Sequence, residues 1–338
     1  MSEKPRILQI STGGTIAMAR DKDGVLSPLK TAEELFDLVP EVSDFAEVNM
    51  LNLTENDSAN LAPPFWTLLS QTIVNNYDKY EGFVITHGTD TMSYTAAALS
   101  FFFQELDKPI VLTGSQIATG MIGSDGKRNL VNSFRVASSN LAEVVVVFGS
   151  KIIRGVRARK ISAFSLEAFE SINEAPLGEI GLTLRISRNR ARRRSGRKLL
   201  YLPNLEPRVA LVTMYPGFSK EFLQAAVDLH KGLVILGYGT GNIPVIPDNY
   251  LINVIKKATQ RKIPVIIGTQ CVLGATKLSL YKVGKSVLDA KAIPSMDMTP
   301  ETALVKLMWI LGQTQDVNQV SSMMMKSYAG ELSNEIEV

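Results

Sequence analysis

The first half of the chain alternates short apolar runs with longer segments of helical pattern. The runs are rich in β-branched residues and bounded by glycine or proline, which is typical of buried strands. They are RILQI (6–10), GFVIT (82–86), PIVLTG (109–114) and EVVVVFG (143–149). The segments predicted to be helices lie at 91–106 and 128–141. Alternation of this kind predicts a parallel sheet with helices on both faces.

The same alternation begins again after residue 206. Thr299 and Pro300 suit the N-cap and the first position of a further helix. The other elements predicted in this half are strands at 208–216, 232–239 and 263–270 and helices near 219–230 and 248–262. The whole pattern predicts an α/β fold of two domains, with mainly parallel sheets flanked by helices.

A basic stretch is expected to join the two domains. We predict an N-terminal domain at 1–184, a linker at 185–207 and a smaller C-terminal domain at 208–338. Residues 185–198, RISRNRARRRSGRK, carry seven arginines, one lysine and no acid. Because unpaired charges are costly to bury, we expect this stretch to be a mobile, solvent-exposed linker.

The positive net charge of the chain comes from this basic stretch alone. The net charge is +3, and removing the eight cations of 185–198 leaves −5 for the remainder. The basicity therefore belongs to one segment and indicates no general affinity for polyanions. The segment contains no aromatic residue that could stack on bases, so a nucleic-acid partner is not expected.

Several classes of protein are disfavoured by simple features. The longest apolar run, around Ala96–Phe103, is too short to span a bilayer, so no membrane partner is expected. The polar start MSEKPR leads straight into the first strand and leaves no room for a signal peptide. One cysteine, Cys271, cannot form an internal disulfide, which favours a cytoplasmic location. Two histidines and one cysteine make a zinc site improbable.

Polar clusters follow four of the predicted strands. They are STGGTIA (11–17), HGTDTM (87–92), TGSQ (113–116) and YGTGNIP (238–244). Ligands of open α/β sheets bind beyond the carboxyl ends of the strands, so several polar clusters at one edge predict a binding site. STGGTIA contains neither a dinucleotide fingerprint nor a Walker loop, but its paired glycines allow close backbone approach to a ligand.

The HGTDTM cluster has two interpretations. Thr89 or Asp90 could simply cap the following helix. Alternatively, the helix N-terminus, a carboxylate and two threonines could form a pocket for a zwitterion. His87 is expected to be structural, because His230, the other histidine, lies in the second domain and a Ser-His-Asp triad is an unlikely design. A hydrolase built here would need another base, such as a lysine.

Six motifs in this order resemble the bacterial-type L-asparaginases, closest to the cytoplasmic type I branch and its archaeal relatives. They are STGGTIA, ITHGTDTM, LTGSQ, SDGKRNL (124–130), GVRARKISAF (155–164) and YGTGNIP. The resemblance extends from residue 6 to GELS at 330–333, and the combination of TGGTIA with HGTDTM is highly specific.

The resemblance implies hydrolysis of L-asparagine, and in some members L-glutamine, to the acid and ammonia without metal or cofactor. Carried over by position, Thr15 is the nucleophile that forms an acyl-enzyme, and Thr89, Asp90 and Lys160 form a companion triad. Lys160 can serve as the base only when it is neutral. The N-terminal domain is thus the expected catalytic domain.

The resemblance also implies substrate-binding residues and a homo-oligomer. Ser58 falls where the family binds the α-carboxylate, with Asp57 beside it, and Asp90 also binds the α-ammonium group. Asn242 falls where a neighbouring subunit reaches into the site, which implies a dimer or tetramer.

One position departs from the family. Val25 stands where relatives have a tyrosine in the lid that follows the nucleophile. Valine cannot relay a proton, so either another hydroxyl such as that of Thr12 takes over or the first half-reaction is slow.

Two other functions stay open. A glutaminase-type subunit of a tRNA-dependent amidotransferase shares the same core, although such chains carry an additional N-terminal domain. A weakly active amino-acid-binding homologue is the second alternative, and Val25 is the feature that favours it.

Overall fold

The computed structural model describes residues 3–20, 26–28, 32–189, 191–193, 196, 198–245 and 249–333. The chain divides into two compact units. Unit 1 comprises Met1–Ser171 with Ala175–Leu202, and unit 2 comprises Ile172–Glu174 with Pro203–Val338. None of the described helices combines the length and the apolar character that crossing a bilayer requires.

Unit 1 is built on a mixed sheet with the strand order β13-β12-β9-β8-β7-β5-β1-β4. The neighbours from β4 to β8 are parallel, whereas β9, β12 and β13 are antiparallel additions. The strands are β1 (Arg6–Ser11), β4 (Glu47–Asn52), β5 (Gly82–Thr86), β7 (Ile110–Thr113), β8 (Val144–Phe148), β9 (Lys151–Arg154), β12 (Gly178–Ile180) and β13 (Leu184–Ile186). The predicted parallel sheet is thereby confirmed.

Three short antiparallel pairs and several helices complete unit 1. The pairs are β2 (Met18–Arg20) with β3 (Leu26–Pro28), β6 (Phe103–Gln104) with β14 (Leu200–Tyr201), and β10 (Ala158–Lys160) with β11 (Phe169–Ser171). The α-helices are α1 (Ala32–Phe36), α2 (Pro63–Asn76), α3 (Met92–Phe102) and α4 (Gly126–Ala137). The 3-10 helices are η1 (Thr15–Ala17), η2 (Pro40–Asp44), η3 (Ser58–Asn60), η4 (Tyr77–Lys79) and η5 (Gly155–Arg157).

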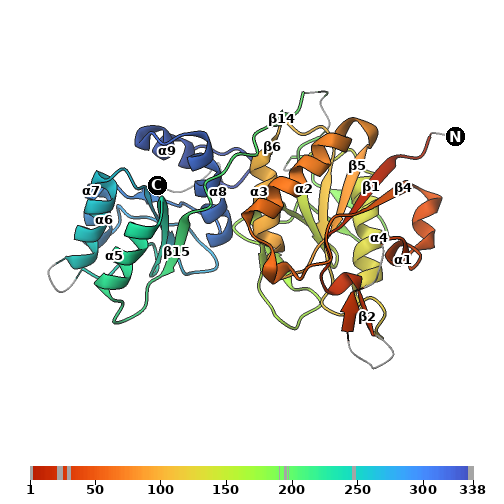
Figure 1. Ribbon diagram of the computed structural model, residues 1–338, viewed down its shortest axis with the longest axis horizontal. Coiled ribbons are helices and arrows are strands. Elements are labelled where there is room, and N and C mark those ends of the chain that lie inside the picture. The colour runs from red at the N-terminus through yellow and green to blue at the C-terminus, as the bar shows by residue number, and fades with distance from the viewer. Residues whose placement is uncertain are drawn as a thin grey trace. The chain divides into compact units, whose positions relative to one another are not determined.

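Helices cover both faces of this sheet, as expected for an α/β fold (Figure 1). Side chains of α1 and α4, among them Leu35 and Phe134, pack with Val84, Val111 and Val145 of adjacent strands into one fully buried cluster. Alternate strand residues point to the same face, which is why the valines at matching register positions meet α4 together. Helices α2 and α3 lie on the other face (Figure 1).

Unit 2 has a smaller, wholly parallel sheet with the order β15-β16-β17-β18. Its elements are β15 (Val209–Thr213), α5 (Lys220–Leu229), β16 (Gly232–Gly237), α6 (Tyr250–Gln260), β17 (Val265–Thr269), α7 (Lys282–Asp289), β18 (Ile293–Pro294), α8 (Pro300–Gln313) and α9 (Val317–Met324). Thr299 caps α8 by accepting a hydrogen bond from the Thr302 N–H, which confirms the predicted helix start. Lys306 of α8 forms a fully buried ion pair with Glu331 that fastens the end of the described chain to the unit.

The basic segment differs from the expected linker. Its first residues belong to β13, and its described remainder belongs to unit 1 up to Leu202. Ala191 is buried in the core, the Arg192 N–H donates to the Glu143 carboxylate over 2.6 Å, and Arg193 pairs with Leu141 as an isolated bridge. Backbone groups, the Ala191 side chain and the Arg193 guanidinium, which donates to the Ile186 carbonyl over 3.2 Å, thus fasten the segment. The Arg192 side chain stays exposed and avoids the cost of burying its charge.

His87 lies directly after β5 and is completely buried. Its Nδ1 donates to the Gly88 carbonyl over 2.6 Å, and its Nε2 accepts from the Thr95 hydroxyl over 2.9 Å. The Trp66 indole N–H in turn donates to that hydroxyl over 3.2 Å. A carbonyl can only accept, so the proton sits on Nδ1 of a neutral imidazole. Burial lowers the pKa of His87 to about 4, against the opposing effect of the Gly88 bond.

We expect protonation of His87 to destabilise the fold in acid. The folded-state pKa is about 4 and the ordinary value is 6.5. The unfolded chain therefore binds the proton more readily, and stability falls as the pH drops from about 6.5 to about 4, by about 3 kcal/mol in all. In a His230→Gln variant, the Cε1–H NMR signal of the remaining histidine should titrate with a midpoint near pH 4. The free energy of unfolding measured with urea should fall as the pH is lowered across the same range. A midpoint above pH 6 would contradict the assignment.

Candidate active site

The carboxyl ends of β1 and β5 are fastened together by Thr12. Its backbone N–H and its hydroxyl both donate to the Thr86 carbonyl, at 3.0 and 2.9 Å. Thr12 is fully buried. Its hydroxyl is therefore committed to the turn, and the idea that it takes over proton transfer from a lid tyrosine is not supported. The segments that follow the two strands leave the sheet side by side.

Glycines allow three loops to approach one another more closely than side chains would permit. Gly14 has φ of +82°, and a Cβ placed on it would lie 2.4 Å from the Gly88 Cα. A Cβ on Gly88 would lie 2.6 Å from the Ser58 Oγ. Both separations are shorter than real Cβ contacts, so neither position can carry a side chain without displacement of its neighbours. The loop after β1 and the HGTDT loop therefore meet backbone to backbone, and the HGTDT loop packs against the Ser58 side chain of the loop after β4.

Thr15 and Ser58 are placed by these loops. Thr15 directly follows Gly14, begins η1 and is half-buried. Ser58 begins η3 and is 2% exposed, and its carbonyl accepts a hydrogen bond from the Thr91 hydroxyl over 2.8 Å. Asp57 caps η3 by accepting from the Ala59 N–H over 2.9 Å. The expected nucleophile and the expected carboxylate-binding residues thus belong to loops in mutual contact.

Lys160 joins the site from β10, far along the sequence. Its Nζ donates to the Thr89 Oγ1 over 2.8 Å and to the Asp90 Oδ1 over 2.7 Å. The side chain of Lys160 is 21% exposed and that of Asp90 is 63% exposed. The lysine is thus shielded, whereas the carboxylate still faces solvent and can reach a second cation. The structure brings the three residues of the expected companion triad into direct contact.

Neither Thr89 nor Asp90 caps the following helix. The N-cap of α3 is Thr91, and none of the α3 N–H groups receives a side-chain cap there. The hydroxyl of Thr91 donates instead to the Ser58 carbonyl. The capping interpretation of these two residues is therefore wrong, and their side chains are free to bind Lys160.

Two further residues with a predicted role, Asn242 and Val25, are not part of this cluster in the described structure. Asn242 belongs to unit 2, where its backbone pairs with that of Tyr238 in an isolated bridge. Its proposed role in a neighbouring site stays a prediction. Val25, the residue that replaces the family's lid tyrosine, lies outside the described residues.

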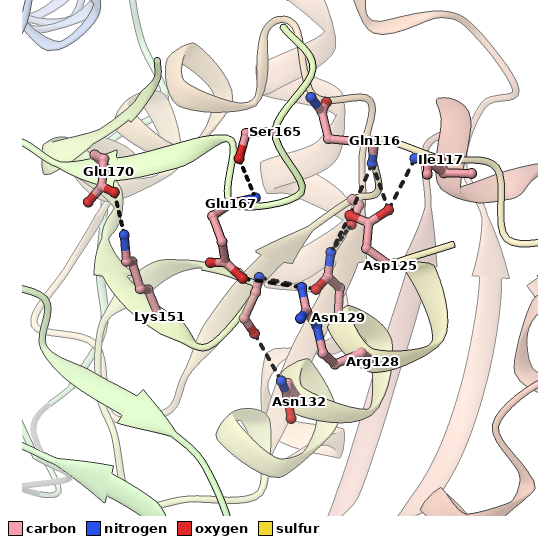
Figure 2. Close-up of polar contacts among 12 residues, drawn as sticks. Gln116, Ile117, Asp125, Arg128, Asn129, Asn132, Lys151, Ser165, Glu167 and Glu170 are labelled. Carbon is pink, nitrogen blue, oxygen red and sulfur yellow. Dashed lines mark hydrogen bonds and ion pairs between the residues drawn. The ribbon is translucent and has the colours of Figure 1, made fainter. Parts of the chain in front are cut away.

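Sequence reasoning gave no role to the SDGKRNL motif, although it supports the site. Asp125 is 3% exposed and accepts hydrogen bonds from the backbone N–H groups of Gln116 and Ile117, all at 3.1 Å. Asn129, one turn along α4, donates to both Asp125 and the Gly114 carbonyl at 2.9 Å (Figure 2). The side-chain oxygen of Asn129 also accepts from the Gly149 N–H. An aspartate followed four residues later by an asparagine at a helix start was the available signal.

Within the described part of the chain, no group of three or more His, Cys, Asp or Glu side chains is placed to hold a metal ion. The cluster of hydroxyls, a carboxylate and an ammonium group can bind a small zwitterion and transfer protons. It offers the elements of nucleophilic acyl transfer: a hydroxyl on a glycine-rich turn and a lysine hydrogen-bonded to a second hydroxyl.

Both parts of the chain match families of known proteins. Residues 6–192 match the family described as "Asparaginase, N-terminal", and residues 208–324 match the "Glutaminase/Asparaginase C-terminal domain". The chain is 39% identical to a glutamyl-tRNA(Gln) amidotransferase subunit of Pyrococcus horikoshii, over 97% of this chain and 77% of that protein. It is 36% identical to an L-asparaginase of Thermococcus kodakarensis, over 97% of this chain and 99% of that protein.

Solved structures show the same relationship. The thermostable L-asparaginase from Thermococcus kodakarensis superposes with a TM-score of 0.91 at 34% identity, covering 98% of this chain and all of that one. L-asparaginase I from Vibrio cholerae superposes with a TM-score of 0.87 at 34% identity and the same coverage. The family matches extend over both units. The chain therefore belongs to the asparaginase family.

Proposed function

We propose that this protein hydrolyses L-asparagine to L-aspartate and ammonia. The observation that carries the proposal is the Lys160 ammonium group, held between the Thr89 hydroxyl and the Asp90 carboxylate. The same loops carry Thr15 on a glycine turn in contact with the Thr89 segment. Similarity to an L-asparaginase over nearly its full length supports this reaction.

The proposed chemistry has two half-reactions. The Thr15 Oγ bonds to the side-chain carbonyl carbon of the substrate, the carbon–nitrogen bond breaks, and the amide nitrogen takes a proton and leaves as ammonia. Water then attacks the resulting ester, which releases aspartate and restores the Thr15 hydroxyl. Lys160, once neutral, accepts a proton through Thr89 and later returns it. Backbone N–H groups near Thr89 would stabilise the oxyanion, a donor being worth about 3 kcal/mol.

The substrate's zwitterion fits the polar groups around Thr15. We assign the α-ammonium group to Asp90, because this carboxylate is exposed on the side not taken by Lys160. We assign the α-carboxylate to the segment Asp57–Ser58 at the start of η3, because these two residues match the positions at which the family binds this group. Burial of Ser58 beneath Gly88 fixes that segment against the HGTDT loop.

The second candidate is the glutaminase-type subunit of a tRNA-dependent amidotransferase. The amidotransferase relative from Pyrococcus horikoshii is 39% identical to this chain. The two functions share the hydrolytic core and differ in the amide used and in dependence on tRNA and a partner. An assay can therefore distinguish the two functions by the amide that is hydrolysed and by the need for tRNA and a partner. The position of the nucleophile does not distinguish them.

We expect the purified protein to release ammonia from asparagine without tRNA. Thr15→Ala should lower kcat by at least about 10³-fold, because it removes the attacking hydroxyl. Lys160→Met should lower kcat by about 10²–10⁴-fold, the usual worth of general-base assistance. The measurement is coupled ammonia release with asparagine and with glutamine, each with and without tRNA.

The outcome of this assay separates the candidates. Release from glutamine alone, or release only when tRNA and a partner protein are present, would favour the amidotransferase. Binding of amino acid without any release would favour a non-catalytic homologue. A Thr15→Ala protein with wild-type turnover would refute the nucleophile.

A methyl group placed between two of the loops is predicted to disturb the site. Gly88→Ala places a methyl group 2.6 Å from the Ser58 Oγ, so one loop must move away from the other. Displacements of this size can cost about 10²-fold in rate, and we expect kcat/KM for asparagine to fall at least tenfold. Gly181→Ala is the matched control, since a Cβ there meets nothing within 4 Å. Equal activity of the two variants would show that the close approach is not required.

We also propose that the working unit is a homo-oligomer in which Asn242 serves a neighbouring copy. The motivation is the position of Asn242 in the YGTGNIP motif of unit 2, matched to family members that share sites between subunits. Light scattering should report a dimer or tetramer. Mixing Thr15→Ala with Asn242→Ala protein should restore activity, because one site of a mixed pair would be intact. An active monomer would contradict this.

A further inference from the structure

We propose that Gln116 is a positioning residue that binds the Thr89 hydroxyl proton in the resting state, so that the Thr89 oxygen stays directed at Lys160 until the lysine becomes neutral. The inference deepens the proposed hydrolysis and rests on it for its kinetic consequences. Gln116 follows β7, the strand next to β5, and reaches across to the HGTDT loop.

The two ends of the Gln116 amide have different partners. Its Oε1 accepts a hydrogen bond from the Thr89 hydroxyl over 3.3 Å. Its Nε2 donates to the Ala163 carbonyl over 3.0 Å, in the loop that follows Lys160. A carbonyl can only accept, so it fixes which end of the amide is nitrogen. The oxygen must therefore face Thr89.

Lys160 determines the direction of the Thr89 proton. A protonated lysine has donors only, so the Thr89 Oγ1 must accept the 2.8 Å bond from Nζ. The hydroxyl proton then points away from Lys160 and towards the Gln116 Oε1. Lys160, Thr89 and Gln116 form a directed chain in which every donor meets an acceptor.

The length of the last bond suits a temporary acceptor. At 3.3 Å, the contact between Thr89 and Gln116 is longer than the usual range for hydroxyl donors. When Lys160 is neutral, its Nζ gains a lone pair, and the Thr89 proton can turn from Gln116 towards it. Gln116 thus keeps the hydroxyl aligned in the resting state without competing strongly once the base is ready.

The backbone of Gln116 is held independently of its side chain. Asp125 binds the N–H groups of Gln116 and Ile117, and Asn129 binds Asp125 (Figure 2). Asp125 and Asn129 are buried, so α4 anchors the loop from below. A substitution at Gln116 should therefore remove the amide without displacing the loop.

Two variants and a control test the role. Gln116→Met removes both side-chain bonds and keeps the length. It should lower kcat for asparagine about tenfold to 100-fold, with KM within about threefold, because binding groups are untouched. Gln116→Glu keeps an acceptor for Thr89 but adds a negative charge near Lys160, which favours the ammonium form. The acid limb of its kcat/KM–pH profile should move to higher pH by about one unit.

Ser115→Ala is the control in the same segment. Among the described residues the Ser115 Oγ has no hydrogen-bond partner, and Ser115 is 1% exposed. This variant should keep wild-type kcat and an unshifted profile. A general loss of folding would lower the activity of all three variants, whereas the positioning role predicts the split between kcat and KM and the shifted profile.

The results also separate this inference from the proposed function. Gln116→Met with kcat within twofold of wild type, or Gln116→Glu with an unshifted profile, would overturn the role of Gln116 while asparagine hydrolysis stands. If the wild type releases no ammonia from either amide, the proposed function fails, and crystal structures of wild type and Gln116→Met decide the role. A lost or rotated Thr89–Lys160 contact in the variant supports it, and an unchanged contact overturns it.

Discussion

The site depends on the approach of backbone to backbone between loops that leave different strands. A Cβ on Gly14 would lie 2.4 Å from the Gly88 Cα, and a Cβ on Gly88 would lie 2.6 Å from the Ser58 Oγ. This contact fixes the distance between the segment that carries Thr15 and the segment that carries Thr89. Side chains at these positions would require one loop to move away from the other. The parallel order β4-β1-β5 places the loops at one edge, and the glycines then bring them together.

A second interaction, the ion pair of Lys160 with Asp90, holds the site together. Lys160 reaches the site from β10 and is the group that ties Thr89 to Asp90. Because Asp90 is largely exposed, the pair is not a buried ion pair held by low dielectric alone. The carboxylate keeps one side open for an ammonium group of a substrate, while Gln116 occupies the far side of Thr89. The Thr89 hydroxyl thus accepts from Lys160 and donates to Gln116 before any ligand arrives.

Much of this arrangement is predictable from sequence because it follows from local pattern. The run GFVIT coincides with β5, and the cap at Thr299 begins α8 as expected. The motifs STGGTIA and HGTDTM identify the loops, and the resemblance supplied Lys160. The end of α3 was not predictable, since Phe103 leaves the helix to pair in β6 with β14, about a hundred residues later. Likewise, Ala191 anchors the basic segment through contacts that its charge pattern hides.

The supporting network escaped sequence reasoning for a related reason. Asp125 binds the Gln116 N–H and Asn129 binds the Gly114 carbonyl, and such partners several positions earlier leave no periodic signal. Sequence reasoning noticed the motif but had no geometry in which to place it. Hydroxyl and amide directions also depend on partners from three separate segments. The positions of strands and loops follow from local pattern, whereas proton directions follow only from assembled contacts.

Two protonation states matter for the HGTDT loop and the residues around it. His87 must stay neutral to donate to Gly88 and accept from Thr95, and acid works against this state. Lys160 must give up a proton before it can accept one from Thr89. The first requirement concerns the packing beneath the HGTDT loop, and the second concerns the chemistry above it. A site of this construction therefore loses the support of its HGTDT loop in acid, because His87 can serve both of its partners only as a neutral imidazole.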